Sequence, residues 1–595
     1  MRTPASLELG VIGNCAIAAL IDRSGSLVWG CWPRFDGDPV FCALVDGEQP
    51  DSGFFSIGFD GDSETEQVYE RNTAVMRTVH RDGSGASFRV TDFVPRFRQF
   101  GRIFHPTMVV RMVEPLGGLP RIRVRVRPRG SNGAERPRPV IGSSHLRWIT
   151  ETGTLRLTTD ASIHHLAEEG AFVLSRPLTF ILHADETLAD QPARVGRDFL
   201  ERTTQWWRDW VRSLNVPYEW QDAVIRAAIT LQLCTFEDTG AMVAALTTSI
   251  PESPVDSRNW DYRFCWIRDA YFTVHALNRV GATTTMERFI DYVTNVIAME
   301  RGPTLKPLYA IVPEAPVEEV EASALAGYRG IRPVRIGNAA RDQVQHDVYG
   351  SVILAAWQMF FDERLPEKGD DALFELLEPL GLMALRRALT PDAGIWEYRE
   401  RERIHTHSAT MCWVACDRLA RIADKLGRAT DARRWHEAAG ELRETILTRA
   451  WHAGGWFAGS LDGDELDAGV LLMHELGIVA ADDPRFVATV DVIGQRLELS
   501  GFLRRYDAPD DFGAPTAAFT ICSFWYVDAL AAMGRGEMAR NLFETLLARR
   551  NHLGLLSEDI DPVTGDLWGN FPQTYSMAGL IVAAIRLSRG WETVR

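Results

Sequence analysis

The sequence predicts a multidomain protein with an N-terminal β-sandwich, a linker helix and a C-terminal (α/α)6 barrel. Residues 1–194 contain many short alternating strands separated by turns, residues 195–216 form one amphipathic helix, and residues 217–595 contain twelve helical stretches. A chain of 595 residues also exceeds one ordinary core of about 100–200 residues, so two domains are expected.

The β-sandwich is predicted from short runs with two-residue periodicity and flanking turn residues. Within Arg121–Arg127, arginines alternate with aliphatic residues, so four arginines share one face of a strand. Because the chain is acidic, we interpret this face as a solvated sheet surface and not as a nucleic-acid stripe. Other strands are predicted at 18–22, 26–29, 88–93, 107–112 and 178–183.

The linker helix is predicted from side chains that recur at helical spacing after residue 195. Phe199, Thr203, Trp206, Trp207 and Trp210 would form one apolar face. Beyond this helix the β pattern stops, and no further strand is expected.

The twelve helical stretches that follow are joined by alternating short and long connections. The connection after each even-numbered stretch is short, as at Gly281, whereas each odd-numbered stretch leads into a long polar and aromatic loop. Short connections join antiparallel neighbours, so six long loops are expected at one end of a closed barrel, where functional residues gather. The stretches are predicted at about 219–235, 268–281, 283–300, 340–363, 369–390, 409–427, 430–448, 464–478, 484–496, 516–534, 536–549 and 574–589.

Composition and charge restrict the function classes. The formal charge of −16 disfavours nucleic acid and anionic membranes as partners, and no apolar run approaches the roughly 18 residues of a membrane span. The N-terminal sequence lacks a signal peptide's apolar core, which predicts a cytoplasmic location. A weak calcium-like pattern at 559–566 lacks the terminal glutamate, so we expect no metal, and the absence of a nucleotide loop predicts no cofactor.

Two glutamates in the long loops are the candidate catalytic groups. Glu397 and Glu558 each lie among apolar and aromatic residues, which keeps a carboxyl group protonatable near neutral pH. Arg268 and Asp269 end another loop and offer a rigid donor fork beside a double acceptor, suited to adjacent hydroxyl groups. The pattern indicates acid/base chemistry on a neutral polar substrate. The alternative for the Arg268–Asp269 pair is an ion pair at a helix start.

An ordered set of short motifs runs along the chain: residues 259–263, 266–269, 394–397, 505–506, 557–558 and 569–573, with residues 32–36 near the N-terminus. Together these motifs resemble the glucoamylase and trehalase family of inverting glycoside hydrolases, glycoside hydrolase family 15. The resemblance covers nearly the whole chain and implies the same sandwich, linker helix and barrel.

The resemblance implies roles for seven residues. Glu397 matches the general acid and Glu558 the general base, and Arg268 and Asp269 match the pair that binds hydroxyls of the terminal glucose. The remaining substrate-binding residues are Trp260, Trp396 and Arg505. At Tyr575 and Met577 the sequence departs from the family, which often has phenylalanine and histidine there, and this leaves the substrate open.

The leading hypothesis is a glucoamylase-like hydrolase that releases β-glucose from the non-reducing end of short α-glucosides. One alternative is a trehalase of the same family, and another is a sugar-binding or regulatory protein without turnover. The two glutamates occupy the third and sixth long loops, which face each other across a six-pair barrel. This placement predicts room for a water molecule and therefore inversion. A small saccharide is the expected partner, and homo-oligomerisation stays open.

Overall fold

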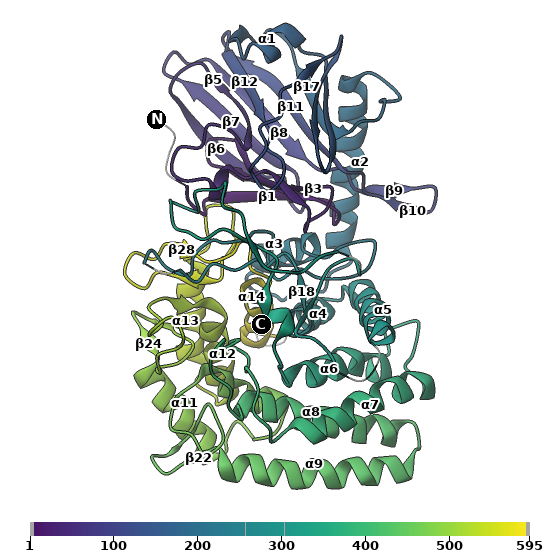
Figure 1. Ribbon diagram of the computed structural model, residues 1–595, viewed down its shortest axis with the longest axis vertical. Helices are drawn as coiled ribbons and strands as arrows, with labels where there is room; N and C mark the ends of the chain where they lie inside the picture. Colours follow the sequence, from purple (N-terminus) through teal and green to yellow (C-terminus); the bar gives the residue numbers. More distant parts are fainter. Residues whose placement is uncertain (1–4, 256, 301, 303, 314, 591–595) are drawn as a thin grey trace.

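The structure is a computed structural model that describes residues 5–590 except 256, 301, 303 and 314. A β-rich region and a helical region lie one above the other, with α2 (Pro192–Arg212) running along the side of the β-rich region towards the helices (Figure 1). The predicted fold class is confirmed.

The β-rich region consists of two antiparallel sheets packed face to face. One has the order β1–β2–β3–β5–β12–β16, with β4 paired to β3, and the other has the order β13–β14–β15–β17–β11–β8–β7–β6. Phe55 and Phe180 make an edge-to-face contact between the sheets, with ring centroids 6.3 Å apart. The first sheet comprises β1 Leu9–Gly13, β2 Ala18–Asp22, β3 Leu27–Trp32, β4 Asp38–Phe41, β5 Phe54–Phe59, β12 Arg121–Arg127 and β16 Phe172–Val173. The second comprises β6 Ser63–Tyr69, β7 Met76–Asp82, β8 Ser87–Phe93, β11 Met108–Gly117, β13 Val140–Ile141, β14 His145–Thr150, β15 Gly153–Thr159 and β17 Leu178–Ala184, and the short helix α1 is Ile163–Ala167.

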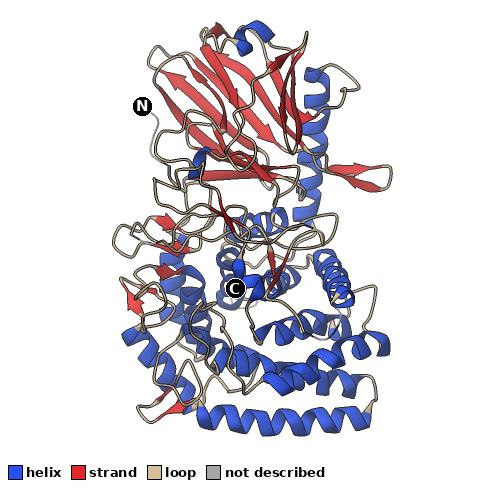
Figure 2. Cartoon of the chain, viewed as in Figure 1, coloured by secondary structure: helices blue, strands red, loops and turns tan. Residues whose placement is uncertain are grey.

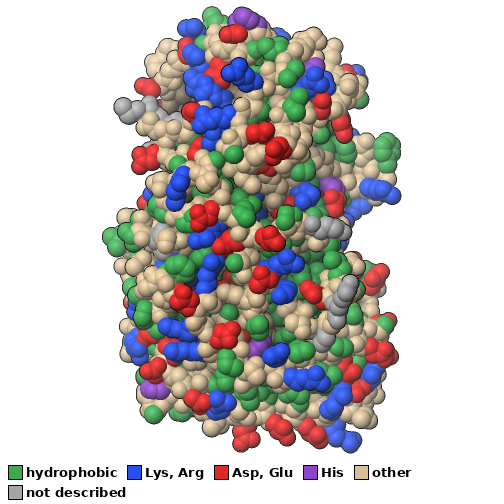
Figure 3. All heavy atoms as spheres, viewed as in Figure 1, with side chains coloured by type: hydrophobic (Ala, Val, Ile, Leu, Met, Phe, Trp, Pro, Cys, Tyr) green, Lys and Arg blue, Asp and Glu red, His purple; other side chains and the backbone are tan. Residues whose placement is uncertain are grey.

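The arginine face of β12 is a solvated surface, as the sequence predicts. Ile122 and Val124 are buried, whereas Arg123 pairs with Asp60 and Arg127 pairs with Glu169 across partly exposed contacts. Figure 3 shows positive and negative side chains interspersed on the face it presents.

Helix α2 begins and ends earlier than the sequence prediction of 195–216. Pro192 occupies the first turn, where the missing N–H costs nothing, and Pro217 disfavours helical backbone in the residue before it. Trp207 is fully buried between the two regions, and the hydroxyl of Thr203 accepts a hydrogen bond from the backbone N–H of Arg96.

The helical region follows the predicted order of short and long connections. Its helices are α3 Gln221–Leu233, α4 Ile267–Arg279, α5 Thr283–Met299, α6 Asp347–Phe361, α7 Asp371–Arg387, α8 Thr406–Lys425, α9 Ala429–Arg449, α10 Met473–Leu476, α11 Pro484–Arg496, α12 Thr520–Ala532, α13 Gly536–Leu547 and α14 Thr574–Leu587. An inner ring is closed by contacts of α4 with α6, of α6 with α8 and of α8 with α10, by contacts of both α10 and α12 with the 3-10 turn η3 (Ala468–Leu472), and by contacts of α12 with α14 and of α14 with α4. The other six helices form the outer layer. They complete the double-layered barrel.

Three helix starts differ from the prediction. The helix expected from 340 begins at Asp347, because Asn338 caps a separate 3-10 turn, η2 (Ala339–Asp342). The helix expected at 464–478 is reduced to α10 and a 3-10 turn, η3 (Ala468–Leu472), which Asp467 caps. The helix expected from 516 begins at Thr520, after strand β26. Polar capping groups favour such local turns over continued helix.

Short strand pairs occur in the long loops, contrary to the prediction of no strand beyond α2 (Figure 2). Each spans two residues, too short to produce a periodic sequence pattern. The pairs are β18 Cys265–Trp266 with β19 Leu308–Tyr309, β20 Val320–Glu321 with β21 Arg335–Ile336, β22 Trp451–His452 with β23 Trp456–Phe457, and β24 Glu498–Leu499 with β25 Phe502–Leu503. A three-stranded unit is formed by β26 Ala518–Phe519, β27 Asp559–Ile560 and β28 Leu567–Trp568.

A separate hairpin, β9 Phe97–Gln99 with β10 Arg102–Phe104, lies in the β-rich region.

The β-sandwich supports the first long loop of the barrel, between α3 and α4. The indole N–H of Trp29 donates to the carbonyl of Leu246 at 2.7 Å, and the guanidinium of Arg263 donates to the carbonyl of Gly37 at 2.8 Å. Arg263 is fully buried and also pairs with Asp261 at 2.6 Å. These contacts fix the loop that carries Trp260 and Tyr262.

Candidate active site

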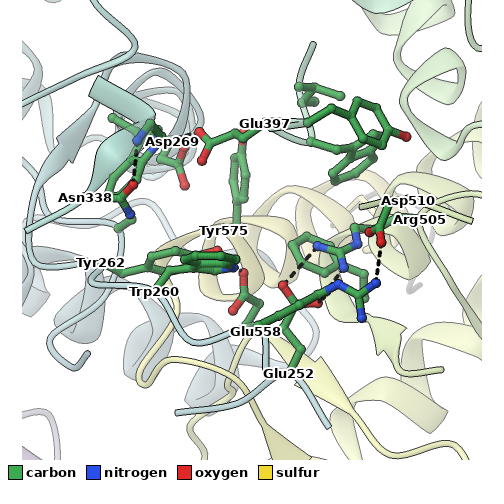
Figure 4. A pocket seen from close by; sticks show the side chains of 18 of the residues that line it. Glu252, Trp260, Tyr262, Asp269, Asn338, Glu397, Arg505, Asp510, Glu558 and Tyr575 are labelled. Carbon is green, nitrogen blue, oxygen red and sulfur yellow. Dashed lines mark hydrogen bonds and ion pairs between the residues drawn. The ribbon is translucent and has the colours of Figure 1, made fainter. Parts of the chain in front are cut away.

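A pocket opens at the end of the barrel where the long loops meet (Figure 4). The space between its lining residues, including the part open to solvent, is about 820 Å³. All seven residues that the sequence singled out line this pocket: Trp260, Arg268, Asp269, Trp396, Glu397, Arg505 and Glu558.

Glu397 is held by donors from two neighbouring loops. Its Oε1 atom accepts hydrogen bonds from Trp266 Nε1 at 2.6 Å, from the guanidinium of Arg268 at 3.1 Å and from Gln345 Nε2 at 3.2 Å. The backbone of Glu397 is left-handed, with φ 61°, which costs a residue other than glycine roughly 1–2 kcal/mol. Gln343 Nε2 donates to the carbonyl of Glu397 at 3.1 Å and supports this strained turn.

Gly394 permits the tight turn before Glu397. Its φ is 68°, and a Cβ atom at this position would lie 2.6 Å from Cδ2 of His405. A side chain here would therefore displace either the ring or the loop.

Trp396 is fixed by a residue of the fourth long loop. Its indole N–H donates to Asp467 Oδ2 at 2.7 Å, and Asp467 Oδ1 accepts from the backbone N–H of Gly469 at 2.7 Å. Burial raises the pKa of Asp467 to about 7. Through Asp467, the fourth loop thus fixes the orientation of Trp396, which lines the pocket.

Glu558 lies on the other side of the pocket and is 2% exposed. Its Oε1 atom accepts a hydrogen bond from the hydroxyl of Tyr262 at 2.7 Å. Burial, and then the nearby carboxylate of Glu252, raise the pKa of Glu558 to about 8, while Tyr262 and Arg505 act in the opposite direction. Burial likewise raises the pKa of Tyr262, which keeps it a neutral donor.

Arg268 and Asp269 occupy the first turn of α4, line the pocket and are both buried. Arg268 donates to Gln345 Oε1 at 2.8 Å and to Asp347 Oδ2 at 3.0 Å, while its Nε atom lies 3.8 Å from Asp269. Burial raises the pKa of Asp269 to about 7, and the positive charge of Arg268 opposes this. The two residues thus form an ion pair at a helix start, and this pair is buried and lines the pocket.

Arg505 and Trp260 also line the pocket. The guanidinium of Arg505 binds both oxygens of Glu252, at 3.2 and 2.5 Å. Trp260 packs edge-to-face on Phe512, and the guanidiniums of Arg399 and Arg335 lie 4.1 and 5.0 Å from its ring centroid. An aromatic face of this kind suits the apolar face of a sugar ring.

Sequence reasoning missed several residues that shape the site. Tyr262 and Trp266 belong to the motifs that carry the family resemblance, and they donate hydrogen bonds to Glu558 and Glu397. Their place in these motifs was the signal that could have identified them. Glu252 and Asp467 had no such signal beyond being acidic residues in long loops.

Within the described residues, no group of His, Cys, Asp and Glu side chains has an arrangement that could hold a metal ion. In the region of the weak calcium-like pattern, Asp561 Oδ1 accepts the backbone N–H of Val563 at 2.8 Å and closes a local turn. Among the described helices, none has both the length and the apolar character needed to cross a membrane.

The sequence pattern of the family described as Glycosyl hydrolases family 15 matches residues 219–585, and that of the Trehalase-like, N-terminal domain matches residues 3–161. The chain belongs to glycoside hydrolase family 15. It is therefore a glycosidase, and the resemblance deduced from the motifs is confirmed.

Relatives align along nearly the whole chain. Proteins named trehalase from Thermoplasma volcanium and Mycolicibacterium smegmatis are both 31% identical; the alignments cover 97% and 99% of this chain and 93% and 92% of theirs. A bacterial glucoamylase solved with acarbose superposes with a TM-score of 0.70 at 13% identity, covering 99% of this chain and 95% of that one. At this identity the glucoamylase structure supports the shared fold.

Proposed function

We propose that this family 15 enzyme hydrolyses α,α-trehalose to two molecules of glucose with inversion at the attacked anomeric carbon. The observation that carries the proposal is the end-to-end similarity to proteins named trehalase. A pocket with two carboxyl groups, a buried Arg–Asp pair and aromatic walls suits a neutral disaccharide.

In the proposed mechanism, Arg268 and Asp269 bind hydroxyl groups of the glucose ring that is attacked. Glu397 donates a proton to the glycosidic oxygen as the C–O bond breaks, and Trp266 and Gln345 hold its carboxyl group in place. Glu558 takes a proton from the water molecule that attacks the anomeric carbon from the opposite face. The attacked ring leaves as β-glucose and the other ring as α-glucose.

The roles of the two glutamates are assigned by their positions in the family motifs. Glu397 has a cationic donor, Arg268, whereas Glu558 has a neutral donor, Tyr262, and a raised pKa. A raised pKa makes Glu558 the stronger base once it is ionised, but it would also suit an acid. The leaving-group experiment below distinguishes the two assignments.

Trp396 and Arg505 flank the pocket on the same side, with the guanidinium carbon 6.0 Å from the indole ring centroid. We propose that they contact the first sugar ring and the bond to be cleaved. Trp260 would receive the second ring, because it lies between charged and aromatic residues that also line the pocket. Binding both rings orients the scissile bond between the carboxyl groups.

This proposal favours the trehalase alternative over the leading glucoamylase-like hypothesis from the sequence. The proteins named trehalase share far more sequence with the chain than the glucoamylase does. A cytoplasmic location stays a prediction from the sequence, and homo-oligomerisation stays open.

The test is glucose release from trehalose, maltose, isomaltose and kojibiose, compared by kcat/KM. We expect trehalose to be preferred by about tenfold or more, since a pocket that pairs substrate hydroxyls rejects analogues that leave polar groups unpaired. A preference for maltose would support the glucoamylase-like hypothesis instead. Saturable binding without glucose release from any of the four would support a binding protein. A Glu397→Gln preparation controls for contaminating glycosidases.

A further inference from the structure

A third carboxyl group lies beside Glu558 in the pocket (Figure 4). Glu252 is 3% exposed and comes from the first long loop, far from Glu558 in the sequence. The two segments are joined directly, because the backbone N–H of Gly569 donates to the carbonyl of Pro251 at 2.7 Å. Gly569 also packs so closely on Glu558 that a Cβ atom there would lie 2.6 Å from Glu558 Cβ.

Of the two carboxyl groups, Glu252 is the one that Arg505 and Arg258 contact. Arg505 directs two N–H groups at Glu252, and Arg258 Nε lies 4.0 Å from the same carboxylate. Glu558 instead has the phenol of Tyr262 as its side-chain donor. A bidentate guanidinium stabilises the ionised form of a carboxylate. Glu252 therefore carries a fixed negative charge next to Glu558.

The other charged and titratable groups that line the pocket with Glu558 come from three loops and from helices α4 and α14. Tyr262 lies on the first loop and Arg505 on the fifth, while Asp269, Glu397 and Tyr575 line the pocket across from Glu558. Among them, Glu252 is the group whose negative charge contributes most to the raised pKa of Glu558. Asp510, by contrast, pairs with Arg258 at 2.5 Å, and its charge is not among the main causes of the raised pKa of Glu558.

We propose that Glu252 is a positioning residue whose buried charge increases the basicity of Glu558 towards the attacking water, while Arg505 keeps that charge in place. The proposal rests on the proposed hydrolysis. A like charge destabilises ionised Glu558, so each ionised Glu558 has a greater tendency to accept a proton from water. As a consequence, Glu558 is ionised in a smaller fraction of the enzyme molecules at acidic pH.

The test compares Glu252→Gln with the wild type. Removing the charge lowers the pKa of Glu558, so the acidic limb of kcat/KM should move to lower pH by about one unit or more, and kcat on the alkaline plateau should fall. Glu252→Asp keeps the charge, and its limb should stay near that of the wild type. Asp510→Asn is the matched control, because it neutralises a buried carboxylate in the same loop network without altering the charge beside Glu558.

A second measurement does not depend on turnover. The affinity for 1-deoxynojirimycin, a cationic glucose analogue, is measured by calorimetry against pH, since its binding is favoured by ionised Glu558. The limb of this binding profile should also move to lower pH in Glu252→Gln, even if trehalose proves not to be the substrate.

An unmoved limb in both profiles, with lower activity in Glu252→Gln, would overturn the proposal and leave Glu252 as an anchor for Arg505. An equal shift in Asp510→Asn would also overturn it, because the effect would then come from general loosening of the loops. If thermal melting shows that Glu252→Gln is not folded, the smaller neutral variant Glu252→Ser takes its place in the same measurements.

Discussion

The ring centroids of Tyr262 and Trp266 lie 5.3 Å apart, and these two residues donate hydrogen bonds to two different glutamates of the pocket. Tyr262 binds Glu558 and Trp266 binds Glu397, so one segment before α4 sets the positions of both carboxyl groups. The sandwich contacts of Trp29 and Arg263 in turn fix this segment.

Replacing Tyr262 by phenylalanine should impair turnover more than binding. The buried Glu558 would lose its side-chain donor, and we expect a decrease in kcat/KM of about 10- to 100-fold, equivalent to about 1–3 kcal/mol. Because Tyr262 lowers the pKa of Glu558, its loss should move the acidic limb to higher pH, opposite in sign to Glu252→Gln. The pH profile of kcat/KM measures both effects, with Tyr526→Phe, outside the pocket, as control. A limb that moves to lower pH would contradict this role.

The glutamine variants of the two glutamates should separate acid from base. Removing proton transfer typically costs about 10²–10⁴-fold, so Glu397→Gln and Glu558→Gln should both lose most activity on trehalose while keeping their melting temperatures. With α-glucosyl fluoride, whose leaving group needs no proton, Glu397→Gln should recover much of its rate and Glu558→Gln should not. Recovery of Glu558→Gln instead would reverse the assigned roles.

The barrel could be predicted because alternating loop lengths fix which helix ends lie together, whatever the exact helix boundaries. The same regularity predicted that Glu397 and Glu558 would share one pocket. Local capping was not predictable from periodicity: Asn338 and Asp467 each start a 3-10 turn where a longer helix was expected. Such turns depend on single side-chain contacts, which leave no repeat in the sequence.

The role of Glu252 could not be predicted for a different reason. Its charge matters through Arg505 and Glu558, which come from two other loops. No spacing within its own segment encodes that contact. Tyr262 and Trp266 could have been predicted as site residues, because they belong to the motifs that carry the family resemblance. Which glutamate each of them binds could be seen only in the folded structure.

Loss of the Arg268–Asp269 pair should affect both kinetic parameters. In Asp269→Ala the buried guanidinium of Arg268 loses a neighbouring charge, and in Arg268→Ala both Asp347 and Glu397 lose a donor. We expect kcat to fall and KM to rise in each variant, because these groups orient the ring as well as bind it. Arg364→Ala, which removes an exposed guanidinium paired with Asp362 outside the pocket, is the control. Unchanged kcat/KM in both pocket variants would assign the pair a structural role.

Asp467→Ala tests the contribution of the fourth loop. The variant leaves the indole N–H of Trp396 without its acceptor, a loss worth about 1–3 kcal/mol, and should lower kcat/KM for trehalose about tenfold. Steady-state kinetics and the fluorescence response to bound sugar both report on Trp396. The neighbouring exposed residue Asp464 provides the control variant Asp464→Ala. Wild-type kinetics in Asp467→Ala would show that Trp396 is held by packing alone.

The stereochemistry of the products tests the placement of the two carboxyl groups. Glu397 and Glu558 come from the third and sixth long loops and lie on opposite sides of the pocket (Figure 4). Carboxyl groups about 6.5–9.5 Å apart leave room for water and give inversion, whereas groups about 5–5.5 Å apart form a covalent intermediate and give retention. Inverting hydrolysis of α,α-trehalose yields one β-glucose from the attacked ring and one α-glucose from the leaving ring. Proton NMR in the first minutes, before mutarotation, should therefore show equal α and β signals. Retention would give α-glucose alone at that stage, and it would exclude the role of Glu558 as the base that activates water.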